Sequence, residues 1–138
     1  MFERKRTMLF CVLAGVFAIG ANLVADSGKR ERRIFEGPLA HVPGQTLTAE
    51  VVEFSPGHKS AVHHHAGSVF AYVLTGSIRS QNSATGPAKI YKAGETFFEP
   101  AGSDHLITEN PSSTEPASLL AIHVAKDGAA LTMPGTAK

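Results

Sequence analysis

The segment from Pro56 to Gly76 reads PGHKSAVHHHAGSVFAYVLTG. It begins as a turn, passes through three histidines and ends as an apolar run that stops at a glycine. Side chains alternate between the two faces of an extended chain, so His63 and His65 are expected to point to the same side. Their positions along the strand are then about 6 to 7 Å apart. Two imidazoles in this arrangement can bind one metal ion if a third ligand comes from elsewhere in the chain.

A second segment, from Gly94 to His105, supplies such a ligand. It reads GETFFEPAGSDH, a short strand that turns at Pro-x-Gly and presents His105 just after the turn. The sequence therefore predicts a metal site built from His63, His65 and His105. Neutral imidazole suits Zn, Cu, Fe and Ni, whereas Mn is less natural without a carboxylate. The alternative is a set of polar side chains at the mouth of a barrel that binds nothing.

The two segments resemble the paired motifs of the cupin family. In the first motif, Gly57, His63, His65 and Gly76 fall on the family positions, whereas Val69 stands where the family has a glutamate. This departure leaves the site one ligand short, so the identity of the fourth ligand stays open.

The second cupin motif matches at Gly94, Pro100, Gly102 and His105, and Asn110 comes one place late. The resemblance covers roughly residues 50–124. It implies a six-stranded conserved barrel with extra strands, one divalent transition metal (Fe, Cu, Ni, Mn or Zn), a small-molecule substrate and a homodimer that protects the edge strands.

Glu99 is the best substitute for the missing carboxylate. It lies directly before Pro100 and shares face parity with Phe97, which is expected to point inward. A buried carboxylate is costly unless it is paired, so an inward Glu99 would bind the metal, accept an imidazole N–H or act as a general base. The alternative is a solvated glutamate at the edge of a loop.

The rest of the chain indicates an all-β domain. Short β-prone runs alternate with Gly/Pro turns, and no helical period follows residue 30, which is typical of a small antiparallel barrel or jelly roll. We expect a linker or edge strand over residues 26–36, with residues 26–33 as a polar linker. The cupin barrel is expected over residues 37–126 and a tail, extended or disordered, over residues 127–138.

The amino-terminal 25 residues read as a secretory signal helix. A basic start is followed by an apolar run from Met8 to Val24, as in a cleaved secretory signal. The alternative hypothesis is that the segment is retained as a membrane anchor. The chain is therefore expected in the periplasm or outside the cell, with a membrane contact only if this segment is retained. Removing residues 1–25 takes three of 13 Lys/Arg and one of 12 Asp/Glu, leaving ten against eleven. This near-neutral balance gives no basis for nucleic-acid binding.

Three histidines leave open positions on an ion, which is typical of a catalytic site rather than a closed structural one. The first hypothesis is a metal-dependent oxygenase, similar in type to quercetinase-like dioxygenases, that acts on a small apolar or aromatic oxygenated substrate. Glu99 would take the substrate's proton. The apolar walls are expected to come from Val69, Ala71, Val73, Phe97 and Leu106. Two alternatives remain: a non-redox metal-dependent isomerase, lyase or hydrolase, and a non-catalytic exported module that binds a metal or small ligand.

Overall fold

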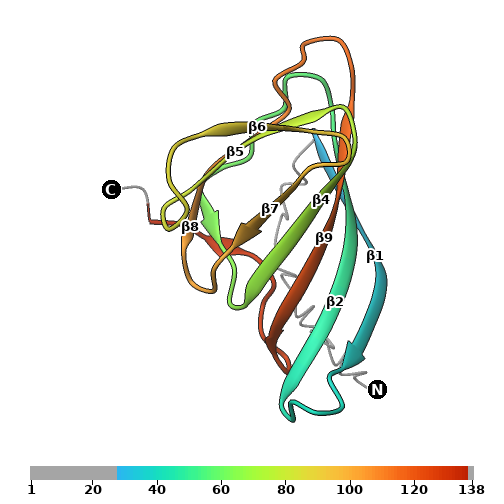
Figure 1. Ribbon diagram of the computed structural model, residues 1–138, viewed down its shortest axis with the longest axis vertical. Helices are drawn as coiled ribbons and strands as arrows, with labels where there is room; N and C mark the ends of the chain where they lie inside the picture. Colours follow the sequence, from blue (N-terminus) through green and yellow to red (C-terminus); the bar gives the residue numbers. More distant parts are fainter. Residues whose placement is uncertain (1–27, 137–138) are drawn as a thin grey trace, which may run out of the picture.

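The computed structural model describes residues 28–136, which form ten β-strands (Figure 1). The strands are β1 (Lys29–Pro38), β2 (Gln45–Phe54), β3 (His63–His64), β4 (Ser68–Thr75), β5 (Ser77–Asn82), β6 (Lys89–Lys92), β7 (Thr96–Glu99), β8 (Asp104–Glu109), β9 (Ala117–Lys126) and β10 (Met133–Pro134). The all-β prediction is confirmed for these residues. The expected signal helix, residues 1–25, lies outside them, and the described part contains no helix long and apolar enough to cross a membrane.

The strands form two five-stranded sheets in which every pair is antiparallel. The first sheet has the order β1-β2-β9-β4-β7 and the second has the order β10-β3-β8-β5-β6. Each sheet thus collects strands from both halves of the chain. This exchange places the β3 and β8 histidines in one sheet opposite β4, β7 and β9 in the other.

The predicted linker over residues 26–33 is wrong from Lys29 onward. Strand β1 begins there and pairs with β2 along its length, from Lys29 opposite Phe54 to Pro38 opposite Thr46. Strand pairing uses backbone groups, so a polar run can still form an edge strand, and charged side chains are common at sheet edges. Lys29 also pairs with Glu31 at 3.0 Å, which helps a charged strand lie against the barrel.

The carboxyl-terminal segment returns to the histidine strand. Met133 lies opposite His64 and Pro134 opposite His63, and Gly135 N donates a hydrogen bond to Val62 O at 2.9 Å. A Cβ at Gly135 would lie 2.7 Å from Val62 Cγ1, so this close approach requires glycine. Through residue 136, the predicted tail is therefore an ordered strap across β3.

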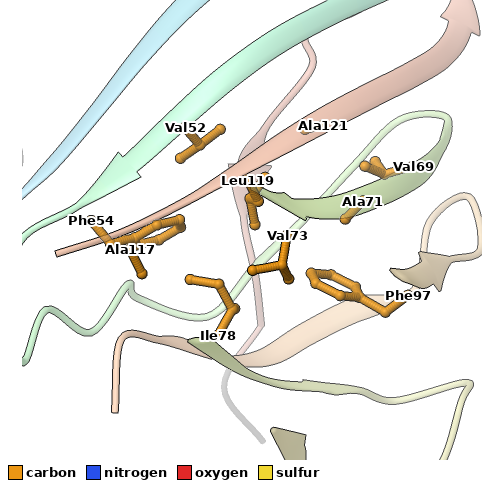
Figure 2. Close-up of a cluster of buried hydrophobic side chains, with 10 residues drawn as sticks. All are labelled: Val52, Phe54, Val69, Ala71, Val73, Ile78, Phe97, Ala117, Leu119 and Ala121. Atoms are coloured by element: carbon orange, nitrogen blue, oxygen red, sulfur yellow. The ribbon is translucent and has the colours of Figure 1, made fainter. Parts of the chain in front are cut away.

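The core lies between the sheets, where the inward residues of β4 and β9 meet those of β2, β5 and β7 (Figure 2). Val69, Ala71 and Val73 alternate with exposed Phe70 and Tyr72 along β4. This alternation is the period of two expected for a strand with one buried face. It places every second residue of β4 toward the interior, including Val69 at the position of the absent cupin glutamate.

Asn110 has a structural role despite its shifted position in the motif. Its side chain is buried, and Nδ2 lies 2.8 Å from Glu115 O and 3.2 Å from Ser55 O. Its Oδ1 accepts a hydrogen bond from Ser112 N at 3.0 Å. One amide side chain thus satisfies backbone groups of two loops, which fixes the end of β8 against the end of β2.

Candidate metal centre

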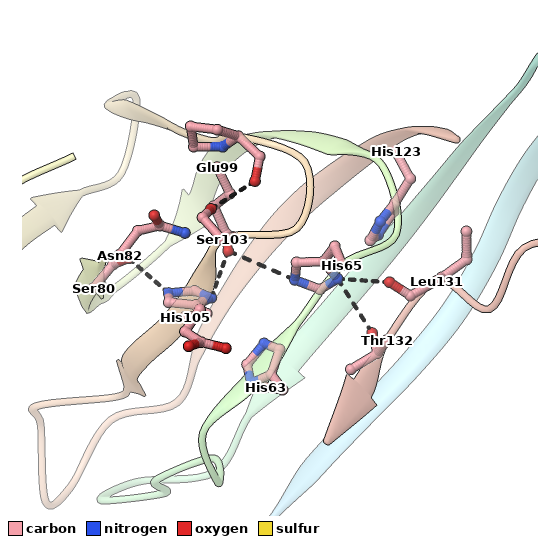
Figure 3. A network of polar contacts seen from close by, with 12 residues as sticks. His63, His65, Ser80, Asn82, Glu99, Ser103, His105, His123, Leu131 and Thr132 are labelled. Carbon is pink, nitrogen blue, oxygen red and sulfur yellow. Dashed lines mark hydrogen bonds and ion pairs between the residues drawn. The ribbon is translucent and has the colours of Figure 1, made fainter. Parts of the chain in front are cut away.

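The structure brings together the three histidines in which the sequence predicted a metal site. His63 in β3 lies directly opposite His105 in β8, and His65 follows two residues after His63. One ring nitrogen from each of the three lies within 4.8 Å of those of the other two (Figure 3). This group could bind a metal ion.

Hydrogen bonds orient two of the imidazoles. His63 Nδ1 lies 2.8 Å from Ala61 O, and His65 Nδ1 lies 2.7 Å from Leu131 O. A carbonyl oxygen only accepts, so both Nδ1 atoms donate and both Nε2 atoms keep their lone pairs. The carboxyl-terminal strap, through Leu131, therefore helps to set the tautomer and ring orientation of His65.

The third imidazole is turned the other way. His105 Nε2 lies 2.7 Å from Ser80 Oγ, so Nδ1 is the nitrogen that faces the cavity. Nδ1 lies 2.9 Å from Glu99 Oε2, which in turn lies 3.6 Å from His65 Nε2. Both His105 Nδ1 and Glu99 Oε2 are buried, and neither has a hydrogen-bond partner among the described residues.

These two buried atoms without a hydrogen-bond partner test whether the residues suit a metal. Ligand atoms bound about 2.0 to 2.2 Å from one ion lie roughly 3 Å apart, and buried polar atoms without a partner are rare in native proteins. A 2.9 Å separation between an imidazole nitrogen and a carboxylate oxygen, without hydrogen-bond geometry, matches two ligands that share an ion. The donor set therefore fits a divalent transition metal.

Sheet register places Glu99 beside Val69, the residue that stands where the cupin motif has a glutamate. Glu99 in β7 is directly opposite Val69 in β4, and His123 in β9 is opposite Val69 on its other side. Residues paired across strands point to the same face. The carboxylate is thus displaced by one strand relative to the cupin motif while it stays in the same row of the sheet.

Burial lowers the pKa of two histidines at the site. It lowers the pKa of His63 to about 4 against the opposing hydrogen bond to Ala61, and it lowers the pKa of His123, which also lies near His65, to about 4. Burial raises the pKa of the Glu99 carboxyl, but the neighbouring His105, His65 and His63 outweigh it and the net shift is downward. At neutral pH His63 is therefore a neutral imidazole and Glu99 a carboxylate, which are the protonation states in which these groups bind metal.

These pKa shifts predict that the metal-free protein loses stability in mild acid. Folded His63 and His123 titrate at about 4 rather than 6.5, so between pH 6.5 and pH 4 the unfolded chain binds protons that the folded chain does not. The free energy of unfolding therefore falls as pH is lowered through this window, by on the order of 2 kcal/mol for each histidine once partial solvent screening is allowed for. Urea unfolding in chelator at pH 7.5, 6 and 5 measures this. His123→Gln should reduce the slope by about half, because His63 still titrates, and His41→Gln, in an exposed loop, should leave it unchanged. A wild-type profile without slope would contradict the prediction.

The histidines line a cavity of about 40 Å³ between the two sheets. This volume holds about three water molecules. Its apolar wall consists of Val52, Phe54, Val69, Ala71, Phe97, Leu119 and Ala121. Of the walls expected from sequence, Val69, Ala71 and Phe97 are confirmed. Val73 is buried in the core but does not line the cavity. The prediction of Leu106 as a wall residue was wrong, because Leu106 lies on the outer side of β8 with 38% of its surface exposed.

A family model described as "Cupin domain" matches residues 50–123, more than half of the sequence. The chain belongs to the cupin family. The match includes both histidine segments and all the strands from β3 to β8, so it covers the candidate metal centre as well as the barrel. A search of curated proteins gave no match.

Solved structures agree with this cupin fold. A conserved protein with a double-stranded β-helix domain from Klebsiella pneumoniae subsp. pneumoniae is 19% identical, with a TM-score of 0.62 over 82% of this chain and 89% of that chain. The polyketide cyclase RemF from Streptomyces resistomycificus is 17% identical, with a TM-score of 0.60 over 81% and 74%. The DMSP lyase DddQ from Ruegeria pomeroyi is 24% identical, with a TM-score of 0.63 over 83% of this chain and 56% of that chain. At these identities the likeness shows the fold alone.

This cupin has a polar wall that the sequence analysis did not predict. His123 is buried, lines the cavity and packs edge-on against His65 with ring centroids 5.2 Å apart. Its Nε2 lies 3.8 Å from Glu50 Oε2, which is too long for a direct hydrogen bond. Strand parity could have found both residues, since His123 alternates with outward Ile122 and Glu50 shares its inward face with Val52 and Phe54.

Proposed function

We propose that this cupin is a metal-dependent enzyme, an oxygenase acting on a small oxygenated substrate. The observation that carries the proposal is the close approach of two buried atoms without a hydrogen-bond partner, Glu99 Oε2 and His105 Nδ1, beside the Nε2 atoms of His63 and His65. In this proposal His63, His65, His105 and Glu99 are the metal ligands. A redox-active ion held by these residues would supply O2 binding and polarisation of substrate oxygen atoms.

The residues around the ligands have separate roles in this proposal. Glu99 is the group that accepts a substrate proton when it is not fully engaged by the ion, because its carboxylate is ionised at neutral pH and lies inside the cavity. Val69, Ala71 and Phe97 exclude water, which strengthens electrostatic interactions in the cavity. His123 and Glu50 offer polar groups that orient the end of the substrate away from the ligands.

The cavity volume narrows the substrate class. A space of about 40 Å³ admits a few non-hydrogen atoms, so a short hydroxy acid, keto acid or diketone fits better than the aromatic substrate considered from sequence. Two similar solved structures are named as enzymes, a cyclase and a lyase. They support an enzymatic reading but do not rank the reactions, because one fold hosts many chemistries.

Metal loading and oxygen uptake test the proposal together. The purified protein is loaded in turn with Fe, Cu, Ni, Mn and Zn, and each form is given a panel of small hydroxy acids, keto acids and diketones in an oxygen electrode. Uptake with a redox-active metal, absent with Zn and absent in Glu99→Gln, is the expected result. Turnover that is retained with Zn and consumes no O2 would favour the non-redox isomerase or lyase, and tight ligand binding without turnover would favour a binding module.

A further inference from the structure

A hydroxyl group on the wall of the cavity has no hydrogen-bond partner within the described part of the chain. Thr108 in β8 is 7% exposed and lines the cavity, and its Oγ1 is buried without such a partner. The other buried atoms with this property lie on Glu99 and His105, which belong to the metal centre, and on Asn82, which does not line the cavity. Outside the metal centre, Thr108 is therefore the described residue that offers the cavity an unused hydrogen-bonding group.

A β-bulge in β8 turns this hydroxyl inward. Strands β5 and β8 pair with a shift that leaves one residue of β8, Leu106, without a partner on β5. Strand alternation alone would point Thr108, three residues after His105, to the outer face, and the extra residue returns it to the inner one. Its partner across the strands is the buried Ser80, which bonds to the ring of His105. The bulge also accounts for the one-place shift of Asn110 in the second cupin motif.

A positively charged side chain enters the cavity from the same end of the barrel. Lys29 in β1 lies opposite Phe54, lines the cavity and has a side chain that is only 18% exposed. Asn110, two residues after Thr108, has its Nδ2 atom 3.2 Å from Ser55 O. The end of β8 thus meets the end of β2, where Lys29 is paired, and this places Lys29 and Thr108 at one end of the cavity.

The charges around the cavity leave the Lys29 ammonium able to bind an anion. It is the only Lys or Arg on the cavity lining of the described residues. Of the three carboxylates on the lining, Glu99 lies against the imidazoles and Glu50 lies 3.4 Å from Arg33 Nε. The third, Glu31, lies 3.0 Å from Lys29 Nζ and is 44% exposed, so water screens its charge more than that of Lys29. An ammonium has three donors, and Glu31 occupies one of them.

We propose that Thr108 and Lys29 together bind the carboxylate of a short hydroxy or keto acid whose second oxygen faces the imidazoles of the metal centre. The inference rests on the proposed function and narrows its substrate class to anions. A hydroxyl and an ammonium both donate, and a carboxylate accepts from both in charge-assisted hydrogen bonds. A neutral ketone of the same size offers a weaker acceptor and no charge. His123 and Glu50, on the other sheet, face the bound molecule from across the cavity.

Replacement of Thr108 by an apolar residue of the same shape separates ligand binding from folding. Thr108→Val exchanges the hydroxyl for a methyl group. In the metal-free protein without ligand, the free energy of unfolding should stay unchanged or rise, because a buried hydroxyl without a partner costs desolvation. Urea unfolding measures this. A clear loss of stability in Thr108→Val that is recovered in Thr108→Ser would assign the hydroxyl to the fold and overturn the inference.

Calorimetric titration of the Zn-loaded protein measures carboxylate binding without oxygen chemistry. The probes are two matched pairs, glycolate with hydroxyacetone and 3-hydroxypropionate with 4-hydroxy-2-butanone, in which acid and ketone have the same number of non-hydrogen atoms. Wild type should bind at least one acid ~10-fold more tightly than its neutral analogue. Thr108→Val and Lys29→Met should each weaken acid binding ~10-fold or more, and Thr108→Ser should retain it. Thr85→Val and Lys92→Met, both at exposed positions, are the matched controls and should leave it unchanged.

Oxygen uptake and carboxylate binding can fail separately. Acid binding that depends on Thr108, in a protein that consumes no O2 with any metal, would reject the oxygenase and keep the carboxylate site. Uptake of O2 with an unchanged KM for the acids in Thr108→Val would keep the oxygenase and overturn this inference. Equal affinity of wild type for acid and neutral analogue, or no binding of either acid at 10 mM, would also overturn it.

Discussion

Replacing His63 and His105 together with alanine is expected to remove bound metal from this cupin, from about one equivalent to less than a tenth. The two imidazoles face each other across β3 and β8, so their loss leaves His65 and Glu99 without the rest of the donor set. Elemental analysis of protein purified in parallel measures the effect. His64→Ala is the matched control, because His64 lies between two of the proposed ligands in sequence but does not line the cavity.

The same double variant is also expected to lose the stabilisation that metal confers. A ligand that binds only the folded state at 100 times its Kd stabilises that state by about 2.7 kcal/mol. Added metal should therefore raise the melting temperature of wild type and His64→Ala by several degrees and leave the double variant unchanged. Equal metal content in wild type and the double variant would contradict the three-histidine site.

Exchanging the two residues of one cross-strand pair is expected to move the carboxylate ligand without destroying the site. Glu99→Val should weaken metal binding by about 100-fold, because it removes the carboxylate that lies beside His65 and His105 and loses a charge-assisted interaction. Adding Val69→Glu should recover most of the affinity. Val69 is directly opposite Glu99 on the same face, and it occupies the position at which the cupin motif has its glutamate.

Competition with a chromophoric chelator measures this exchange, with Glu99→Gln as a control of nearly unchanged volume. Glu99→Gln should lose affinity as Glu99→Val does, because the charge rather than the shape binds the ion. Full affinity in Glu99→Val would show that the carboxylate is outside the ligand set and would restrict Glu99 to a role in proton transfer. Failure of Val69→Glu to rescue would show that the two positions are not equivalent despite their register.

Much of this molecule could be predicted from sequence because the deciding signals are local. The His-x-His spacing in an extended segment sets the face of His63 and His65, and the alternation along β4 sets the inward face of Val69. Turn residues mark most strand ends, which is sufficient to indicate an all-β barrel. Val69 at the glutamate position was also visible in sequence, and so was Glu99 as the candidate replacement, because both rest on parity and motif position.

The tertiary structure alone decided which distant segments meet. The opposition of Glu99 and His123 across Val69 depends on the register of three strands, and registers arise from long-range pairing that no local pattern records. The same is true of the bond from His65 to the carbonyl of Leu131, which brings a polar tail back to the site. The first half of strand β1 was taken for a linker because backbone pairing, rather than side-chain hydrophobicity, holds an edge strand. Sequence thus determined the chemistry available to this cupin, whereas the folded sheets determined which groups share one cavity.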